Sequence, residues 1–214
     1  MLRAASALYD KIIRPRQRWD SDPWTSPKTA MLPCVIISSP IRDHRTAIMS
    51  APEDSTRDDV AKIELDPRAP DWDELHSLIT AAYAYMSGRI DPPSSLLAMV
   101  PADFAQKAAD EHLIVALVDG RLVGCVFCRR KSEWLYIGKL AVSPARQRSG
   151  VGRLLINAAQ KLADEEGLAG LELETRIELT ENHRAFDRLG FVTVAELSHP
   201  GYTRITSIRM RSPL

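Results

Sequence analysis

The chain of 214 residues has few cysteines, no net charge and no long apolar run, and each of these absences excludes a class of protein. Three cysteines cannot build a disulfide framework, which indicates a reducing compartment such as the cytosol. The 28 basic and 28 acidic residues cancel, so no field of one sign favours nucleic acid or an acidic membrane surface as a partner. No apolar run approaches the ~20 residues that a membrane span needs. We therefore expect a cytoplasmic protein that binds neither nucleic acid nor membrane.

Metal-ligating residues are equally sparse. Cys125 and Cys128 form the one C-x-x-C of the sequence, and the five histidines are scattered. Both cysteines lie in residues 122–129, which read as a strand, so their side chains are expected on opposite faces. No metal site is therefore expected, and both cysteines are interpreted as small buried apolar residues.

The first 58 residues differ from the remainder of the chain. They contain prolines at short intervals and show no sustained hydrophobic period. Acidic residues such as Asp10 and Asp20 argue against an organelle presequence, and no continuous apolar region marks a secretory signal. We expect residues 1–58 to be a poorly ordered and dispensable extension, and residues 59–214 to form one domain. Met49 is an alternative start of translation.

Hydrophobic periodicity after residue 59 predicts strands and helices in an interleaved order. Asp71 starts a helix as its N-cap, Pro101 begins a second helix, and Asp119-Gly120 marks a hairpin turn. Strands are expected at residues 60–65, 113–118, 122–129, 134–142, 170–175, 191–197 and 203–210. Helices are expected at residues 72–86, 101–111, 151–166 and 181–189, the last of them capped by Thr180. The connections make the first strands antiparallel and the pair around the third helix parallel.

The chain is organised around residues 140–155, which read as a strand end, a basic turn and the first turns of a helix. Gly150 and Gly152 let the backbone come close to a ligand. The free N–H groups of the new helix then favour an anion, most often a phosphate. The stretch has no Gly-Lys-Ser/Thr of a phosphate loop and no three-glycine dinucleotide fingerprint.

The sequence Gln147-Arg148-Ser149-Gly150-Val151-Gly152 resembles the acetyl-coenzyme A loop of the Gcn5-related N-acetyltransferases (GNAT), whose signature is Gln/Arg-x-x-Gly-x-Gly/Ala. Leu140-Ala141-Val142 precedes it, and Asn182 and Gly190-Phe191 follow it, as in that family. The resemblance covers residues 60–214. It implies an α/β (α+β) fold with a mixed, mostly antiparallel central sheet of about seven strands, helices on both faces and a splayed parallel strand pair. An ordinary strand-to-helix turn with packing glycines is the alternative.

The resemblance also implies how acetyl coenzyme A binds. Its pantetheine arm would pair with the backbone of Leu140, Ala141 and Val142. Its pyrophosphate would lie over the six residues from Gln147 to Gly152, held mainly by backbone N–H groups. Arg146, Arg148 and Arg153 are candidates for the outer phosphates, with a solvated surface as the alternative. The residues so implied are Leu140, Ala141, Val142, Gln147, Arg148, Ser149, Gly150, Val151, Gly152 and Arg153.

A general base is expected on the strand at residues 170–175. Glu174-Thr175-Arg176 matches a Glu-x-Arg pattern of the family, so Glu174 is the first candidate and Glu172, on the same strand face, the second. A solvent-facing strand edge is the alternative for both glutamates. Glu133 and Glu178 are further candidates.

The sequence departs from the family pattern at the residue expected to act as general acid. The place of the tyrosine that commonly protonates the leaving thiolate holds Phe186, beside the coenzyme. Tyr202 or Tyr136 could substitute, or solvent could supply the proton, because a thiolate needs little help. Asn182 matches an asparagine near the pantetheine, with a local helix cap as the alternative.

The expected activity is acetyl-coenzyme A-dependent N-acetylation. The loops at residues 87–99 and 198–206 correspond to those that recognise the acceptor in the family, and they carry no cluster of one charge. A small-molecule amine and a protein N-terminus both remain open as acceptors, and so does a homodimer. The alternatives are a non-catalytic coenzyme A-binding sensor of the same fold and an O-acyl or longer-chain acyltransferase.

Overall fold

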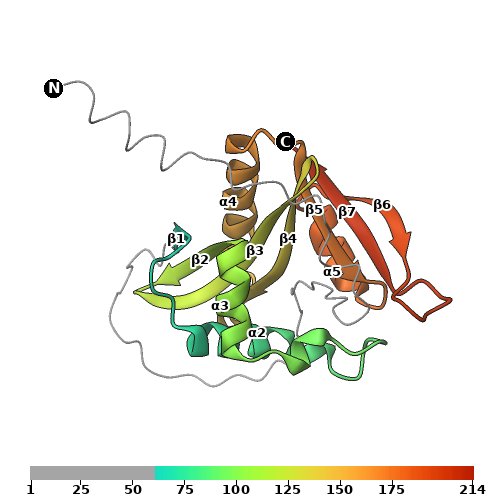
Figure 1. Ribbon diagram of the computed structural model, residues 1–214, viewed down its shortest axis with the longest axis horizontal. Coiled ribbons are helices and arrows are strands. Elements are labelled where there is room, and N and C mark those ends of the chain that lie inside the picture. Colours follow the sequence, from blue (N-terminus) through green and yellow to red (C-terminus); the bar gives the residue numbers. More distant parts are fainter. Residues whose placement is uncertain (1–60) are drawn as a thin grey trace, which may run out of the picture. The chain divides into compact units, whose positions relative to one another are not determined.

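The computed structural model describes residues 61–214, and the helices and strands follow in the predicted order (Figure 1). The predicted extension, residues 1–58, lies outside the described residues. The strands are β1 (Lys62–Leu65), β2 (His112–Val118), β3 (Arg121–Lys131), β4 (Trp134–Val142), β5 (Gly170–Arg176), β6 (Val192–Leu197) and β7 (Ser207–Pro213). The α-helices are α2 (Trp72–Tyr83), α3 (Pro101–Asp110), α4 (Val151–Glu165) and α5 (Thr180–Asp187). Short 3₁₀ turns are η2 (Ala84–Met86), η3 (Ser95–Ala98) and η4 (Pro144–Arg146).

The seven strands form one sheet in the order β1-β2-β3-β4-β5-β7-β6. All neighbouring pairs are antiparallel except β4 and β5, which are parallel because α4 connects them. This confirms the predicted mixed, mostly antiparallel sheet. None of the helices within residues 61–214 is long and apolar enough to cross a membrane.

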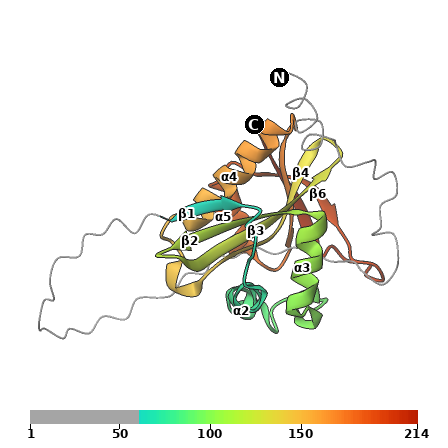
Figure 2. The ribbon, with the colours of Figure 1, turned by 60° about the vertical axis from the view of Figure 1, so that its left-hand side comes forward.

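Helices lie on both faces of the sheet (Figure 2), and a cluster of buried hydrophobic residues lies on each face. On one face, α4 and α5 bury Leu155, Ile156 and Phe186 against the strands. On the other face, α2 and α3 bury residues such as Leu75 and Phe104. Helices therefore lie on both faces, as predicted. Because α4 follows β4 after a short turn, the start of α4 lies toward the carboxyl end of this central strand.

The parallel pairing of β4 and β5 is very short. Only Leu135 pairs with Leu171 and only Tyr136 with Glu172, although both strands continue for several residues. Beyond that point β4 stays paired with β3 through a register shift, and Lys139 at this irregularity has a φ of 53°. The two central strands therefore diverge toward their carboxyl ends, which agrees with the splay implied by the family resemblance.

Cys125 and Cys128 are fully buried and belong to the two different hydrophobic clusters, as the alternation of a strand predicts. Two details of the prediction were wrong. Thr180 is the first residue of α5 and not its N-cap, a position that Leu179 takes. The last strand begins at Ser207 and not at residue 203, because residues 203–206 still belong to the loop that precedes it.

Candidate active site

The coenzyme loop lies between the end of β4 and the start of α4. After Val142, the turn η4 leads into Gln147 and then into Arg148, whose φ of 67° is left-handed. The Ser149 hydroxyl donates to the Arg146 carbonyl at 2.6 Å, which closes this turn on itself. Gly150 is also left-handed, with a φ of 89°, and such a conformation favours glycine. The sequence therefore builds a compact turn whose exit directs the chain straight into a helix.

The start of α4 differs from that of α2. Asp71 caps α2 by accepting hydrogen bonds from the N–H groups of Asp73 and Glu74. Gly150, at the corresponding position of α4, has no side chain and makes no such cap. A Cβ added at Gly152 would meet only Val142 Cγ2, at 3.8 Å, so the first turn of α4 has room around its backbone. Uncapped N–H groups and the helix dipole favour an anion at this end.

The backbone of residues 140–142 runs beside this helix start. Leu140, Ala141 and Val142 follow the last pairing of β4 with β5, so their β5-facing edge takes no part in the β4–β5 ladder. Their side chains are buried, and Ala141 and Val142 keep their pairing with β3 on the other edge. The Tyr83 hydroxyl donates to the Leu140 carbonyl at 3.4 Å. The backbone predicted to pair with pantetheine therefore lies at the divergence of the two strands.

Glu172 and Glu174 share the face of β5 opposite Leu171 and Leu173, as predicted, and both are ion-paired. Arg209 on β7 donates to Glu174 Oε1 through Nε at 3.0 Å and Nη2 at 2.6 Å. Glu172 contacts three cations: Arg211 at 2.7 Å, Lys131 at 3.1 Å and Arg209 at 3.5 Å. Neither glutamate is therefore a solvent-facing strand residue, and both are less than a tenth exposed.

The surroundings of Glu172 determine its protonation. Burial alone would raise the pKa of Glu172, but hydrogen bonds from Arg211 and Lys131 outweigh burial and hold that pKa below the ordinary 4.5. Glu172 pairs directly with Tyr136, where β4 and β5 are still joined. Glu174 is two residues further along, past the last β4–β5 pair, and so lies closer to the divergence.

A carboxyl with a lowered pKa makes stability depend on pH. Glu172 contributes stability above the unfolded pKa near 4.5, and that contribution is lost as pH falls through the lower folded pKa. We expect Glu172→Gln to flatten the acid side of the stability curve below about pH 4.5. Urea unfolding of both proteins at pH 7 and at steps from about pH 5 to 3 checks this. Glu165→Gln is the control, because its pair with Lys161 is exposed, and it should leave the curve unchanged. If stability falls in the same way at low pH in wild type and in Glu172→Gln, the pKa of Glu172 is not lowered by folding.

Asn182 is completely buried on α5. Its Nδ2 donates to the Tyr85 hydroxyl at 2.9 Å, which links α5 to η2 at the end of α2. Phe186 is also completely buried and contacts Phe191 edge-on, with ring centroids 5.4 Å apart. Whether either residue contacts the coenzyme stays a prediction. No sequence pattern indicated the Tyr85–Asn182 contact, because the residues are 97 positions apart.

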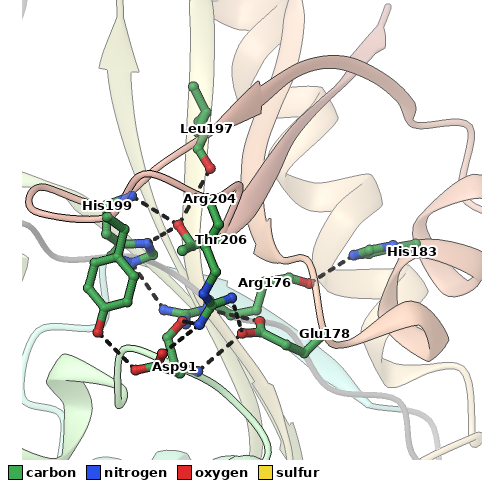
Figure 3. A network of polar contacts seen from close by, with 9 residues as sticks. Asp91, Arg176, Glu178, His183, Leu197, His199, Arg204 and Thr206 are labelled. Atoms are coloured by element: carbon green, nitrogen blue, oxygen red, sulfur yellow. Dashed lines mark hydrogen bonds and ion pairs between the residues drawn. The ribbon is translucent and has the colours of Figure 1, made fainter.

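The two predicted acceptor loops meet at the end of β5 (Figure 3). The Tyr202 hydroxyl donates to Asp91 Oδ1 at 2.8 Å, and Arg204 forms an ion pair with the same carboxylate. Because Tyr202 donates to Asp91, the pKa of Tyr202 is raised, and the same hydrogen bond helps to lower the pKa of Asp91. Tyr202 therefore holds its proton more tightly than an ordinary tyrosine. Burial and the nearby Glu174 raise the pKa of Tyr136 as well.

Tyr202→Phe tests whether this tyrosine is the general acid. We expect turnover to fall less than about tenfold, because a tyrosine with a raised pKa is a poor proton donor and a thiolate needs little help. Steady-state thiol release from acetyl coenzyme A, at saturating coenzyme, measures the effect. A loss of ~10²-fold or more in turnover, with coenzyme affinity unchanged, would make Tyr202 the acid after all.

The sequence did not indicate the cations that neutralise the glutamates. Lys131, Arg209 and Arg211 come from β3 and β7, and only the register of β7 against β5 brings the arginines opposite Glu174 and Glu172. Within residues 61–214, no group of three or more histidine, cysteine or acidic residues is arranged to hold a metal ion.

Comparison with known proteins gives a family match. The model of the "Acetyltransferase (GNAT) family" matches residues 72–191, which is more than half of the chain. The matched range runs from the start of α2 to Phe191 and so contains the coenzyme loop, both glutamates and α5.

Several solved structures have a fold similar to that of this chain. The PaiA N-acetyltransferase of Thermoplasma acidophilum, in complex with coenzyme A, is 13% identical with a TM-score of 0.60, and the match covers 72% of this chain and 99% of that one. The ribosomal-protein-S18-alanine N-acetyltransferase of Escherichia coli is 18% identical with a TM-score of 0.52, over 72% and 94%. A nourseothricin acetyltransferase is 26% identical with a TM-score of 0.45, over 50% and 66%. The chain thus spans slightly less than two thirds of that last enzyme.

Proposed function

Because this chain belongs to the acetyltransferase (GNAT) family, we propose that it transfers an acetyl group from acetyl coenzyme A to a primary amine of a small molecule or a protein N-terminus. The observation that carries the proposal is the divergence of β4 and β5 after two paired residues, beside a helix that begins at a left-handed glycine. Residues 59–214 would form the catalytic domain. A cytoplasmic location and a homodimer are further parts of the proposal.

The coenzyme would be held at the start of α4. Its pyrophosphate would accept hydrogen bonds from the backbone of residues 147–152, where the helix dipole favours negative charge. Its pantetheine arm would extend along Leu140, Ala141 and Val142, whose β5-facing edge is outside the β4–β5 ladder. Arg148 and Arg153 are exposed and would reach outer phosphates. The thioester would then lie between the diverging strands.

The reaction joins the amine to the thioester carbonyl. The amine nitrogen attacks the carbonyl carbon, a C–N bond forms, the C–S bond breaks, and coenzyme A leaves as the thiolate. The proton released by the ammonium would pass to Glu174, directly or through a water, since this carboxylate lies past the last paired residues of β4 and β5. Arg209 would hold Glu174 in place. Phe186 offers no proton, so the thiolate would take one from solvent.

The rival function is a coenzyme A-binding sensor of the same fold, which Phe186 in the place of the tyrosine favours. An O-acyl or longer-chain transferase is the other alternative. A sensor differs from any transferase in its chemistry, because a sensor binds acetyl coenzyme A without releasing thiol. Incubation of the protein with acetyl coenzyme A and panels of amines, peptides and alcohols, read as thiol release, separates them. Acetylated amine identified by mass spectrometry supports the proposal, and coenzyme binding with no thiol release from any acceptor contradicts it.

A further inference from the structure

A buried arginine, Arg176, and a partly buried glutamate, Glu178, lie at the carboxyl end of β5, where the acceptor loops meet (Figure 3). Arg176 is the last residue of β5 and is 2% exposed. Glu178 follows two residues later. Past this end of β5, loop 87–99 contributes Asp91, and loop 198–206 contributes His199 and Arg204.

The guanidinium of Arg176 is incompletely paired for a buried cation. Its Nη1 contacts His199 Nε2 at 3.0 Å, whereas its Nε and Nη2 donate no hydrogen bond within the described part of the chain. Its carboxylate neighbour is Glu178, with Nε and Oε2 3.6 Å apart, which is beyond the range of a hydrogen bond. An arginine is always protonated, so a buried guanidinium with donors unused needs a further acceptor.

His199 cannot supply a negative charge to Arg176. Burial is the main reason that the pKa of His199 is lowered to about 4, and the neighbouring Arg176 contributes. The imidazole is therefore neutral near pH 7. Since Arg176 can only donate, His199 Nε2 accepts, and His199 Nδ1 carries the proton toward the Thr206 hydroxyl. This arrangement fixes the tautomer and leaves the charge of Arg176 uncompensated by His199.

Glu178 also lacks a hydrogen-bond partner, but on an acceptor atom and not on a donor. Its Oε1 accepts from the Asp91 N–H at 3.1 Å and lies 3.8 Å from Arg204 Nη1. Its Oε2 is buried and accepts no hydrogen bond from the described residues. An unused acceptor of Glu178 therefore lies beside the unused donors of Arg176.

The cover over this pair is held by exposed contacts that can separate. Arg204 and Asp91 are 49% and 60% exposed at their side chains, and exposed ion pairs contribute little to stability. Asp91 is already neutralised by Arg204 and hydrogen-bonded to Tyr202, so its charge does not compete for Arg176. Opening of loops 87–99 and 198–206 would expose Arg176 and Glu178 together.

We propose that the acceptor is a small amino acid whose carboxylate binds Arg176 and whose ammonium binds Glu178. This inference rests on the proposed function and names the class of its acceptor. In an α-amino acid the nitrogen and a carboxylate oxygen are about 3 Å apart, close to the 3.6 Å that separates Arg176 Nε from Glu178 Oε2. Such a zwitterion adds one charge of each sign and leaves the net charge of the site unchanged. A protein N-terminus has no carboxylate next to its amine and would leave Arg176 unsatisfied.

Matched acceptors test the proposal on the unaltered protein. Each α-amino acid is compared with its carboxamide and with its decarboxylated amine, at equal coenzyme concentration, by thiol release. We expect kcat/KM to be ~10²-fold or more higher for the acid than for the other two, because neither of them has a carboxylate to pair with Arg176. Equal values for acid and carboxamide, or a preference for the carboxamide or a peptide, overturn the proposal.

Two variants test whether Arg176 recognises the carboxylate of the acceptor or only forms a structural ion pair with Glu178. Arg176→Gln should raise KM for the acid and abolish the preference over the carboxamide, while Arg204→Gln, at the exposed cover, should keep that preference. Coenzyme affinity by calorimetry should be unchanged in both. If Arg176→Gln does not fold, the ratio of kcat/KM for the acid to that for the carboxamide, measured on the unaltered protein, still tests the proposal. A folded Arg176→Gln variant that keeps the preference overturns the assignment.

Failure of the proposed function gives a different result. In that case no acceptor releases thiol, although acetyl coenzyme A binds. Calorimetric titration of the coenzyme-bound protein with acid and carboxamide then tests the pair by itself. Binding of the acid ~10²-fold more tightly supports the pair as an amino acid site, and equal binding overturns it.

Discussion

Gly152→Asp is expected to weaken the binding of acetyl coenzyme A by ~10²-fold or more while the protein stays folded. Gly152 is the second residue of α4, and the aspartate would place bulk and negative charge where the pyrophosphate is proposed to lie. The fold should tolerate the side chain, because a Cβ at this position meets only Val142 Cγ2, at 3.8 Å. An acidic residue in the first turn also suits the helix dipole, so stability should not suffer.

Gly152→Ala is the matched control for this prediction. Alanine adds the same Cβ without charge, and the family signature allows it at this place, so coenzyme affinity should change only a few-fold. Isothermal titration with acetyl coenzyme A on both variants, alongside their melting temperatures, gives the comparison. Unchanged affinity in a folded Gly152→Asp protein would remove this loop from the account.

Glu174→Gln is expected to lower turnover by ~10²–10⁴-fold with coenzyme affinity nearly unchanged, which is the usual contribution of a positioned proton transfer. Glutamine has the same shape and can still accept from Arg209, but it cannot take a proton from the acceptor ammonium. Raising the pH should partly restore activity, because more of the amine is then already neutral.

Glu172→Gln tests whether Glu172 acts as the general base or only as a member of the ion-pair network. Glu172 contacts Lys131, Arg209 and Arg211 and lies where β4 and β5 are still paired, so its loss should affect stability more than turnover. Thiol release against pH for wild type and both variants gives the readout. Full activity of Glu174→Gln across neutral pH would make Glu174 a structural residue and would leave proton transfer to Glu172 or to water.

The order of elements could be predicted from the sequence because local signals specify it. The Asp119-Gly120 turn, Pro101 at the start of α3 and the short apolar runs of β2 and β3 each act over a few residues. The glycine turn before α4 was predicted for the same reason, since Gly150 takes the left-handed conformation that its position requires. These signals do not depend on distant parts of the chain.

The polar partners of the site could not be predicted, because they depend on contacts between distant segments. Arg209 reaches Glu174 through the register of β7 against β5, across 35 positions of sequence. Tyr202 reaches Asp91 across 111 positions, because the two acceptor loops meet beyond the end of β5. The sequence showed that Glu174 and Glu172 share a face, but not that both are ion-paired.

Release of thiol from acetyl coenzyme A in the presence of an amine tests the central claim most directly. The measurement uses the full chain, acetyl coenzyme A and the amine panel, with Gly152→Asp as the variant that should bind coenzyme ~10²-fold more weakly. We expect thiol release that requires an amine, an equal amount of acetylated amine by mass spectrometry, and a large loss of both in Gly152→Asp. Tight binding of acetyl coenzyme A with no thiol released by any amine would contradict it and would make this chain a coenzyme-binding protein without transferase activity.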